Sequence, residues 1–223
     1  DWIITTDADC LVQKDWLTTF DQYIQENEVE MVASGVCYVP KSGFLSAFQN
    51  LDFLSLQGAT IGSFGIDQPF MCNGANFAYS KQFFKELNGF QGNETIASGD
   101  DVFLLQKAVI VAPEKVGFLL AKESIVATKP TESWSDLFQQ RVRWASKSTG
   151  YSSVYGKLLA LIVFSGNLAW ILSFLLWLLG LLDQNIFMLF VALKFLIDFI
   201  LLYKTANFFE SKLQYVLASS LLY

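Results

Sequence analysis

Histidine is absent from the 223 residues of this chain. Its absence removes the commonest general base of enzymes and excludes the nucleophilic systems in which histidine activates a serine or a cysteine. Acid–base chemistry in this protein must therefore rely on carboxylates. The three cysteines, Cys10, Cys37 and Cys72, are widely separated and match neither a zinc-binding spacing nor a disulfide framework, which is consistent with a reducing compartment.

Basic residues are also scarce. The chain has 15 Lys and Arg against 21 Asp and Glu, which gives a net charge of −6. A nucleic-acid-binding protein usually carries a basic patch, so this balance argues against a nucleic-acid partner. The sequence has no initiator methionine and no signal peptide, and it ends in an apolar run, residues 213–223. We therefore expect a fragment that lacks both ends of its protein.

The apolar residues, 53% of the chain, are unevenly distributed. Residues 1–150 have the composition of a soluble domain. Residues 158–182 carry no charge, residues 186–203 form a second apolar run, and a third begins near residue 213. A helix needs about 20 apolar residues to cross a bilayer, and the first two runs are of this length. We therefore expect an α/β domain over residues 1–150 and a transmembrane region over residues 157–223.

Charged residues around the apolar runs predict how they cross the membrane. The basic residues that flank the two runs are Arg141, Arg143, Lys147, Lys157, Lys204 and Lys212. The connecting turn, residues 183–185, has none. By the positive-inside rule, we expect a protein integral to the cytoplasmic (inner) membrane with its acidic domain in the cytoplasm. Within the second run, Lys194 and Asp198 are spaced to pair on one helix face.

Local patterns in the first 150 residues predict alternating strands and helices, which is an α/β arrangement. The expected strands cover Ile3 and Ile4, residues 31–38 and residues 124–128. The expected helices cover residues 15–25, 44–56, 80–87, 102–108 and 131–144. Residues 58–69 are glycine-rich and are expected to form a loop. The broad apolar face of residues 44–56 fits either a packed core or a surface that lies on the membrane.

Two carboxylates, Asp7 and Asp9, follow the first expected strand. In extended backbone, side chains two residues apart project to the same side, so these carboxylates can converge on one point. Two close carboxylates repel each other unless a cation lies between them, and hard oxygen ligands suit Mg²⁺ or Mn²⁺. The alternative is that both acids cap the helix that follows them.

Three further features follow in order. Residues 72–76, Cys-Asn-Gly-Ala-Asn, predict a tight turn. Asp100 and Asp101 begin a predicted helix, where their simplest use is to cap it and to interact with its dipole. Gln140, Arg143 and Trp144 form a Gln-X-X-Arg-Trp motif shortly before the first apolar run.

These features, in this order and followed by apolar runs, resemble the membrane-integrated family 2 glycosyltransferases, the group of cellulose synthase, hyaluronan synthase and ceramide glucosyltransferase. The resemblance implies the C-terminal part of a GT-A (nucleotide-diphospho-sugar transferase) domain followed by transmembrane helices. It also implies an inverting, metal-dependent, hexosyltransferase-like enzyme that moves a sugar from a nucleotide-diphosphate sugar to a lipid or glycan acceptor at the membrane. On this resemblance, we expect the family's N-terminal half, with its uridine-binding acids, to lie outside the given residues. The Ser-Gly before the acidic pair disfavours cellulose as the product.

The resemblance assigns roles to the acidic residues. Asp101 would be the general base that takes the proton from the acceptor hydroxyl as its oxygen attacks the anomeric carbon. Asp100 would support it. Asp9 would hold Mg²⁺ or Mn²⁺, with Asp7 near the nucleotide or the metal, so that charge on the diphosphate leaving group is neutralised.

The resemblance also places the other motif residues around the substrates. Gln140 would line the site, and Arg143 would meet the diphosphate, because a guanidinium matches phosphate oxygens. Trp144 would form a platform for the acceptor, and the alternative for it is an anchor at the membrane interface. Asn73 and Gly74 would contact the donor.

Two other classes of protein also fit part of the sequence. A phosphohydrolase of the haloacid dehalogenase type also has a strand ending in Asp-X-Asp, with Asp7 as its nucleophile. That family usually has Thr or Val where Leu11 stands, and it gives no reason for the Gln-X-X-Arg-Trp motif. A non-enzymatic membrane protein or transporter would explain the apolar runs, but not the two acidic sites.

Overall fold

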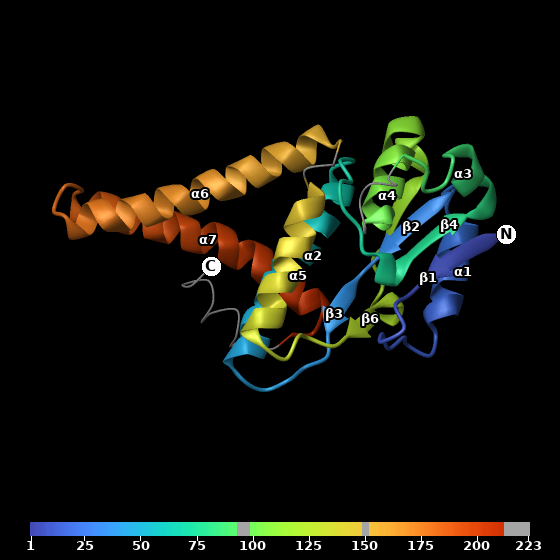
Figure 1. Ribbon diagram of the computed structural model, residues 1–223, viewed down its shortest axis with the longest axis horizontal. Coiled ribbons are helices and arrows are strands. Elements are labelled where there is room, and N and C mark those ends of the chain that lie inside the picture. The colour runs from blue at the N-terminus through green and yellow to red at the C-terminus, as the bar shows by residue number, and fades with distance from the viewer. Residues whose placement is uncertain (93–98, 149–151, 212–223) are drawn as a thin grey trace. The chain divides into compact units, whose positions relative to one another are not determined.

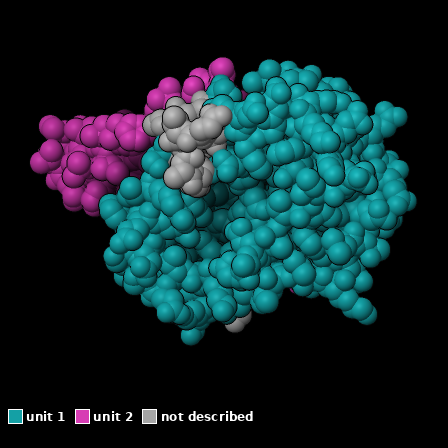
Figure 2. Space-filling view, turned by 45° about the vertical axis from the view of Figure 1, so that its right-hand side comes forward, with its two compact units in different colours: residues 1–153 teal, residues 154–223 magenta. Residues whose placement is uncertain are grey.

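The computed structural model describes residues 1–92, 99–148 and 152–211. The chain divides into two compact units, an α/β unit (residues 1–153) and a helical unit (residues 154–223), which Figure 2 shows in different colours. Sheets with helices packed on them make up the first unit, so the expected α/β class is confirmed (Figure 1).

Among the described residues, a four-stranded mixed sheet forms the centre of the α/β unit. Its strands lie in the order β1 (Trp2–Thr5), β4 (Phe77–Ser80), β2 (Met31–Ser34) and β5 (Val116–Leu119). β4 runs antiparallel to both of its neighbours, whereas β2 and β5 are parallel. Thr5 at the end of β1 therefore lies opposite Phe77 at the start of β4. As a result, the segment after β1 and the segment before β4 meet at one end of the sheet.

Helices cover both faces of this sheet. In the described part of the α/β unit, the α-helices are α1 (Trp16–Glu26), α2 (Phe44–Gly65), α3 (Lys81–Glu86), α4 (Asp100–Val111) and α5 (Trp134–Ser148). On one face, Met31, Phe77 and Tyr79 pack with residues of α3 and α4. On the other face, Val32 and Ala78 pack with α1. Because successive strand residues face opposite sides, β2 and β4 are buried along their whole length.

The α/β unit also contains a smaller, two-stranded sheet. β3 (Val36–Tyr38) pairs in parallel with β6 (Val126–Thr128), and Leu11 forms a bridge with Ala127. The short 3₁₀ helices of the unit are η1 (Gly74–Asn76), η2 (Pro113–Lys115) and η3 (Lys122–Ser124). The bridge at Leu11 holds the segment that follows the two N-terminal acids beside β6.

The strands differ from the prediction in three respects. A single strand over residues 31–38 is wrong, because the chain breaks at Gly35 and β2 and β3 belong to different sheets. The apolar run at Ile3 and Ile4 predicts a buried first strand, but β1 lies at the sheet edge and Ile3 is 36% exposed. Sequence reasoning misses β4 and β5, and Gly117 weakens the strand pattern of β5. A Cβ at Gly117 would lie 2.8 Å from the hydroxyl oxygen of Tyr23, so a larger residue there would have to displace this side chain of α1.

The predicted loop over residues 58–69 is also wrong, because α2 continues to Gly65. Gly58, Thr60 and Ser63 are buried in this last part of the helix. Burial of small residues against the rest of the unit outweighs the low helix propensity of glycine. The other expected elements are present, with ends shifted by a few residues.

The described part of the helical unit consists of α6 (Val154–Leu178) and α7 (Gln184–Phe208). Their most apolar stretches have mean hydropathies of 2.2 and 2.4 and are only 6% and 11% buried, so both helices are long and apolar enough to cross a membrane. Trp177 stacks on Phe187 with ring centroids 4.8 Å apart, which packs one helix on the other. The side chain of Asp183 caps α7.

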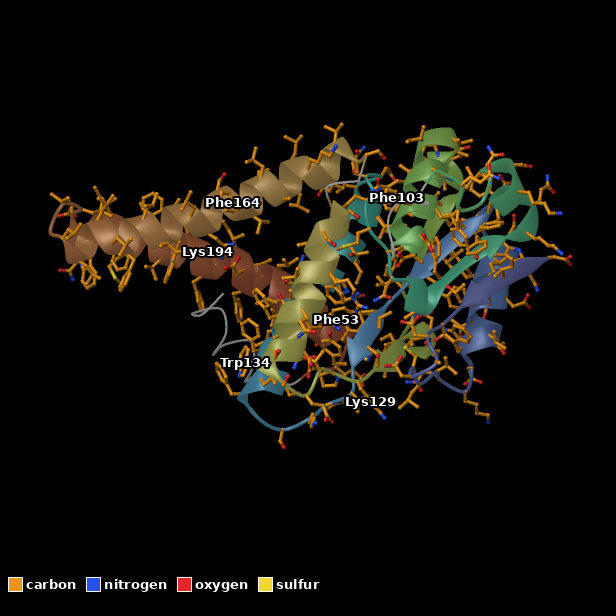
Figure 3. The ribbon with its side chains drawn as sticks, viewed as in Figure 1. Phe53, Phe103, Lys129, Trp134, Phe164 and Lys194 are labelled. Carbon is orange, nitrogen blue, oxygen red and sulfur yellow. The ribbon has the colours of Figure 1, made fainter. Side chains whose placement is uncertain are left out.

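One ion pair lies within α7. Lys194, labelled in Figure 3, pairs with Asp198 one helical turn away, as their spacing predicts. The third apolar segment expected near residue 213 lies outside the described residues.

Candidate active site

The two N-terminal acids lie in a turn, not in a strand. β1 ends at Thr5, and the backbone N–H of Cys10 donates to the carbonyl of Asp7 at 3.1 Å. The expected convergence through strand alternation is therefore wrong in its geometry. The turn brings the side chains together instead: one ligand atom each of Asp7, Asp9 and Cys10 lies within 4.8 Å of the others. We call residues 7–10 the acidic turn.

The chemistry of the acidic turn fits a hard divalent cation. The carboxylates of Asp7 and Asp9 are exposed, so a cation can reach them together with water or a substrate phosphate. Capping of the next helix is not their use, because α1 begins at Trp16 and its N-cap residue is Asp15. Sequence reasoning gives no role to Cys10, whose half-buried sulfur completes the group; a thiol suits softer metals than Mg²⁺.

A second turn lies beside the end of β1. The hydroxyl of Thr5 donates to the carbonyl of Gly74 at 2.6 Å, and the N–H of Gly74 donates to Asp101 Oδ2, also at 2.6 Å. The backbone of Gly74 therefore connects the strand that leads to the acidic turn with the first turn of α4. Asp101 is half-buried, whereas Asp100 is exposed. Of the two predicted acids, the structure directs Asp101 toward this turn.

Two asparagines hold the second turn in place. The side-chain oxygen of Asn73 accepts from the N–H of Ala75 at 3.0 Å and so caps η1. The fully buried Asn76 accepts from Trp16 Nε1 at 3.0 Å. Its amide also donates to the carbonyls of Gly35 and Ser124, at 2.7 Å each. Sequence reasoning missed Asn76, because nothing local distinguishes an asparagine whose partners lie in three distant segments.

Cys72 lies just before this turn and is buried. Burial raises the pKa of the Cys72 thiol well above its usual value, and the negative charge of Asp101 raises it further. The side chain therefore stays protonated at neutral pH. A protonated thiol is neither a good nucleophile nor a metal ligand, so Cys72 serves as a packing residue here.

The Gln-X-X-Arg-Trp motif lies on α5. Trp144 is half-buried and packs against a cluster formed by Val36, Tyr38, Phe53 and Ala75. The rings of Trp144 and Phe53 have centroids 6.2 Å apart (Figure 3 labels Phe53). Cys10 packs against the same cluster, which also includes a residue of the second turn. The structure therefore brings the acidic turn, the second turn and Trp144 together around one apolar cluster.

The other motif residues differ from one another in their environment. Arg143 is exposed, whereas Gln140 is half-buried. The side chain of Gln140 accepts a hydrogen bond from Arg141 Nη1 at 2.7 Å. Sequence reasoning considered Arg141 only as a positive flank of the membrane region, yet it is the motif's most connected side chain. Its partner, Asp52 on α2, lies too far away in the sequence to be recognised.

The comparison with known families agrees with this arrangement. The family model for glycosyl transferase family group 2 matches residues 2–209. The chain therefore belongs to the family 2 glycosyltransferases, as the motif order predicts. No curated protein matches it. This membership favours glycosyl transfer over the phosphohydrolase and the non-enzymatic transporter.

Proposed function

We propose that this protein transfers a sugar from a nucleotide-diphosphate sugar to a lipid or glycan hydroxyl, with inversion at the anomeric carbon and with the help of a divalent cation. Membership of family 2 supports glycosyl transfer from a nucleotide sugar. The single observation that carries the mechanism is the position of Asp101, whose carboxylate is fixed by Gly74 N–H at 2.6 Å beside the end of the strand that leads to the acidic turn.

Asp101 acts as the general base in this proposal. Its carboxylate takes the proton of the acceptor hydroxyl while that oxygen forms a bond to the anomeric carbon. The bond from that carbon to the diphosphate oxygen breaks, and its electron pair leaves with the nucleoside diphosphate. One displacement inverts the configuration. The exposed Asp100 supports the start of α4 and interacts favourably with the helix dipole.

Asp7 and Asp9 are the residues that would hold Mg²⁺ or Mn²⁺. When bound there, the cation would neutralise negative charge on the diphosphate. The exposed guanidinium of Arg143 would bind diphosphate oxygens, and Asn73 and Gly74 would contact the donor. Gln140 and the half-buried ring of Trp144 would line the acceptor side.

We also propose that α6 and α7 cross the cytoplasmic membrane as a helical hairpin. The low burial of their apolar stretches supports this, since a core helix of a soluble protein would be mostly covered. The basic residues on the outer flanks favour a cytoplasmic α/β unit.

The test uses full-length protein in detergent and a panel of nucleotide sugars. We expect one donor to give nucleotide release that requires Mg²⁺ or Mn²⁺ and stops with a chelator. The Asp101→Asn variant should release nucleotide much more slowly. Absence of release with every donor would overturn the proposal, and hydrolysis of a phosphomonoester instead would favour the phosphohydrolase.

A further inference from the structure

A partly buried ion pair joins α2 to α5. Arg141 Nε donates to Asp52 Oδ2 at 2.7 Å, and Nη2 of the same guanidinium also pairs with that oxygen. The two side chains are only 25% and 19% exposed. Taking both charges out of water has a large desolvation cost, and apolar residues of similar size would join two helices at least as well. The pair therefore calls for an explanation beyond helix packing.

The guanidinium of Arg141 contacts two of the three defined residues of its motif, Gln140 and Trp144. It lies over the ring of Trp144, 4.3 Å from the centroid, as a cation–π contact. Its Nη1 donates to Gln140 Oε1 at 2.7 Å. Its positive charge opposes the rise that burial causes in the pKa of the Tyr38 phenol. One side chain thus sets the position of the Trp144 ring and of the Gln140 amide.

Helix geometry explains why Arg141 occupies this position and Arg143 does not. Residues 141 and 144 are three apart, so their side chains lie on one face of α5. Asp52 on α2 lies next in the chain to Phe53, whose ring packs against Trp144. α2 therefore fixes Arg141 through Asp52 and touches Trp144 through Phe53.

We propose that Asp52 and Arg141 are positioning residues, which hold Trp144 and Gln140 in the orientation that the acceptor requires. This inference rests on the proposed function, in which Trp144 is the acceptor platform. The pair touches neither donor nor metal in this scheme. Its loss should therefore slow turnover and leave donor recognition unchanged. A misplacement of about 1 Å can lower a rate by roughly 100-fold.

The first test measures nucleotide release from membranes that contain the full-length protein and its natural acceptor, with the donor concentration varied. Asp52→Asn and Arg141→Lys should each lower kcat by roughly 10- to 100-fold, with KM for the donor unchanged within about twofold. Lysine keeps the charge but loses the planar fork and the stacking on the ring. A rise in donor KM would assign Arg141 to the diphosphate and overturn the proposal.

A double variant separates positioning from stability. Asp52→Leu combined with Arg141→Met removes both charges and leaves neither one buried without a partner. We expect this double variant to unfold at a temperature no lower than that of the wild type. Its kcat should nevertheless stay as low as that of the single variants. Wild-type kcat in this variant would show that the pair serves only to join the helices.

A second ion pair of the same unit provides the matched control. Lys41 Nζ lies 3.5 Å from Glu132 Oε1, and it joins the segments that lead into the same two helices, but both side chains are exposed. Glu132→Gln should change neither kcat nor KM. If the wild type releases nucleotide but Asp52→Asn is equally fast, the inference fails and the proposed function stands. If the wild type releases none, both fail.

Discussion

The backbone N–H of Gly74 donates to Asp101 Oδ2 at 2.6 Å, although the two residues are 27 positions apart. A Cβ at Gly74 would lie 3.1 Å from the same oxygen and 3.3 Å from Asp101 Cβ. The turn and the carboxylate are therefore fitted so closely that any side chain at this position would have to move the acid. The proposed base and the turn act as one unit.

Gly74→Ala tests this fit. The added methyl should displace the Asp101 carboxylate and lower turnover by roughly 10- to 100-fold, because the base would lose its alignment with the acceptor. Nucleotide release at saturating donor provides the measurement. Gly62→Ala is the control: it lies within α2 with open space around its Cβ, so it should keep full activity and stabilise the fold by about 0.5–1 kcal/mol. Normal activity in Gly74→Ala would contradict the tight fit.

Substitution of the acidic pair should identify the base. Asp101→Asn keeps size and hydrogen bonding but cannot accept the acceptor proton, so transfer should fall by roughly 10²–10⁴-fold while donor and metal still bind. Asp100→Asn should lower the rate of transfer less, since Asp100 is exposed at the start of α4. Rates and donor affinity of the two variants are compared. Equal losses would mean that the pair acts together, and a larger loss at Asp100 would move the base by one residue.

The metal site is tested at Asp9. Asp9→Asn removes one charged oxygen ligand, so Mg²⁺- or Mn²⁺-dependent turnover should fall by roughly 100-fold or more, because bound metal contributes several kcal/mol. Turnover is measured against metal concentration. Asp21→Asn, an exposed acid on α1, should leave the metal dependence as it is in the wild type. Full activity of Asp9→Asn in a chelator would exclude the cation from the reaction.

The topology is tested with a single reactive thiol. A cysteine at Asn185, introduced by Asn185→Cys in a background without the three native cysteines, should react with an impermeant thiol reagent in intact cells. A cysteine at Lys147 should react only after lysis. Labelling of the second position in intact cells would reverse the orientation and place the α/β unit outside the cytoplasm.

Local patterns predicted most helices and the order of the site features, because apolar spacing and acid positions are properties of short stretches. They could not predict how those stretches meet. Thr5 reaches Gly74 because β1 pairs with β4 and not with the next strand in the sequence. That pairing depends on the packing of the whole sheet, which no short stretch encodes.

The same limit applies to the polar contacts of the site. Asn76 hydrogen-bonds three distant segments, and Asp52 pairs with Arg141, which is 89 residues away in the sequence. Neither contact can be recognised from the neighbouring residues in the sequence. The extension of α2 to Gly65 is a related case, since burial in the folded unit decides it against the propensity of its glycines.

The turn at Asn73 and Gly74 also affects the chemical stability of the protein on storage, because an Asn-Gly sequence can deamidate. In an Asn-Gly sequence, the glycine nitrogen can attack the side-chain carbonyl of asparagine, releasing ammonia and leaving a succinimide that opens to aspartate or isoaspartate. Here that nitrogen directs its hydrogen to Asp101, and the Asn73 oxygen accepts from Ala75. Both reacting groups therefore already take part in hydrogen bonds, one of which orients the proposed base. Truncation of Asp101 removes one of these hydrogen bonds, so we expect the rate of deamidation on storage to change, and the chemical identity of residue 73 has to be checked in every such preparation.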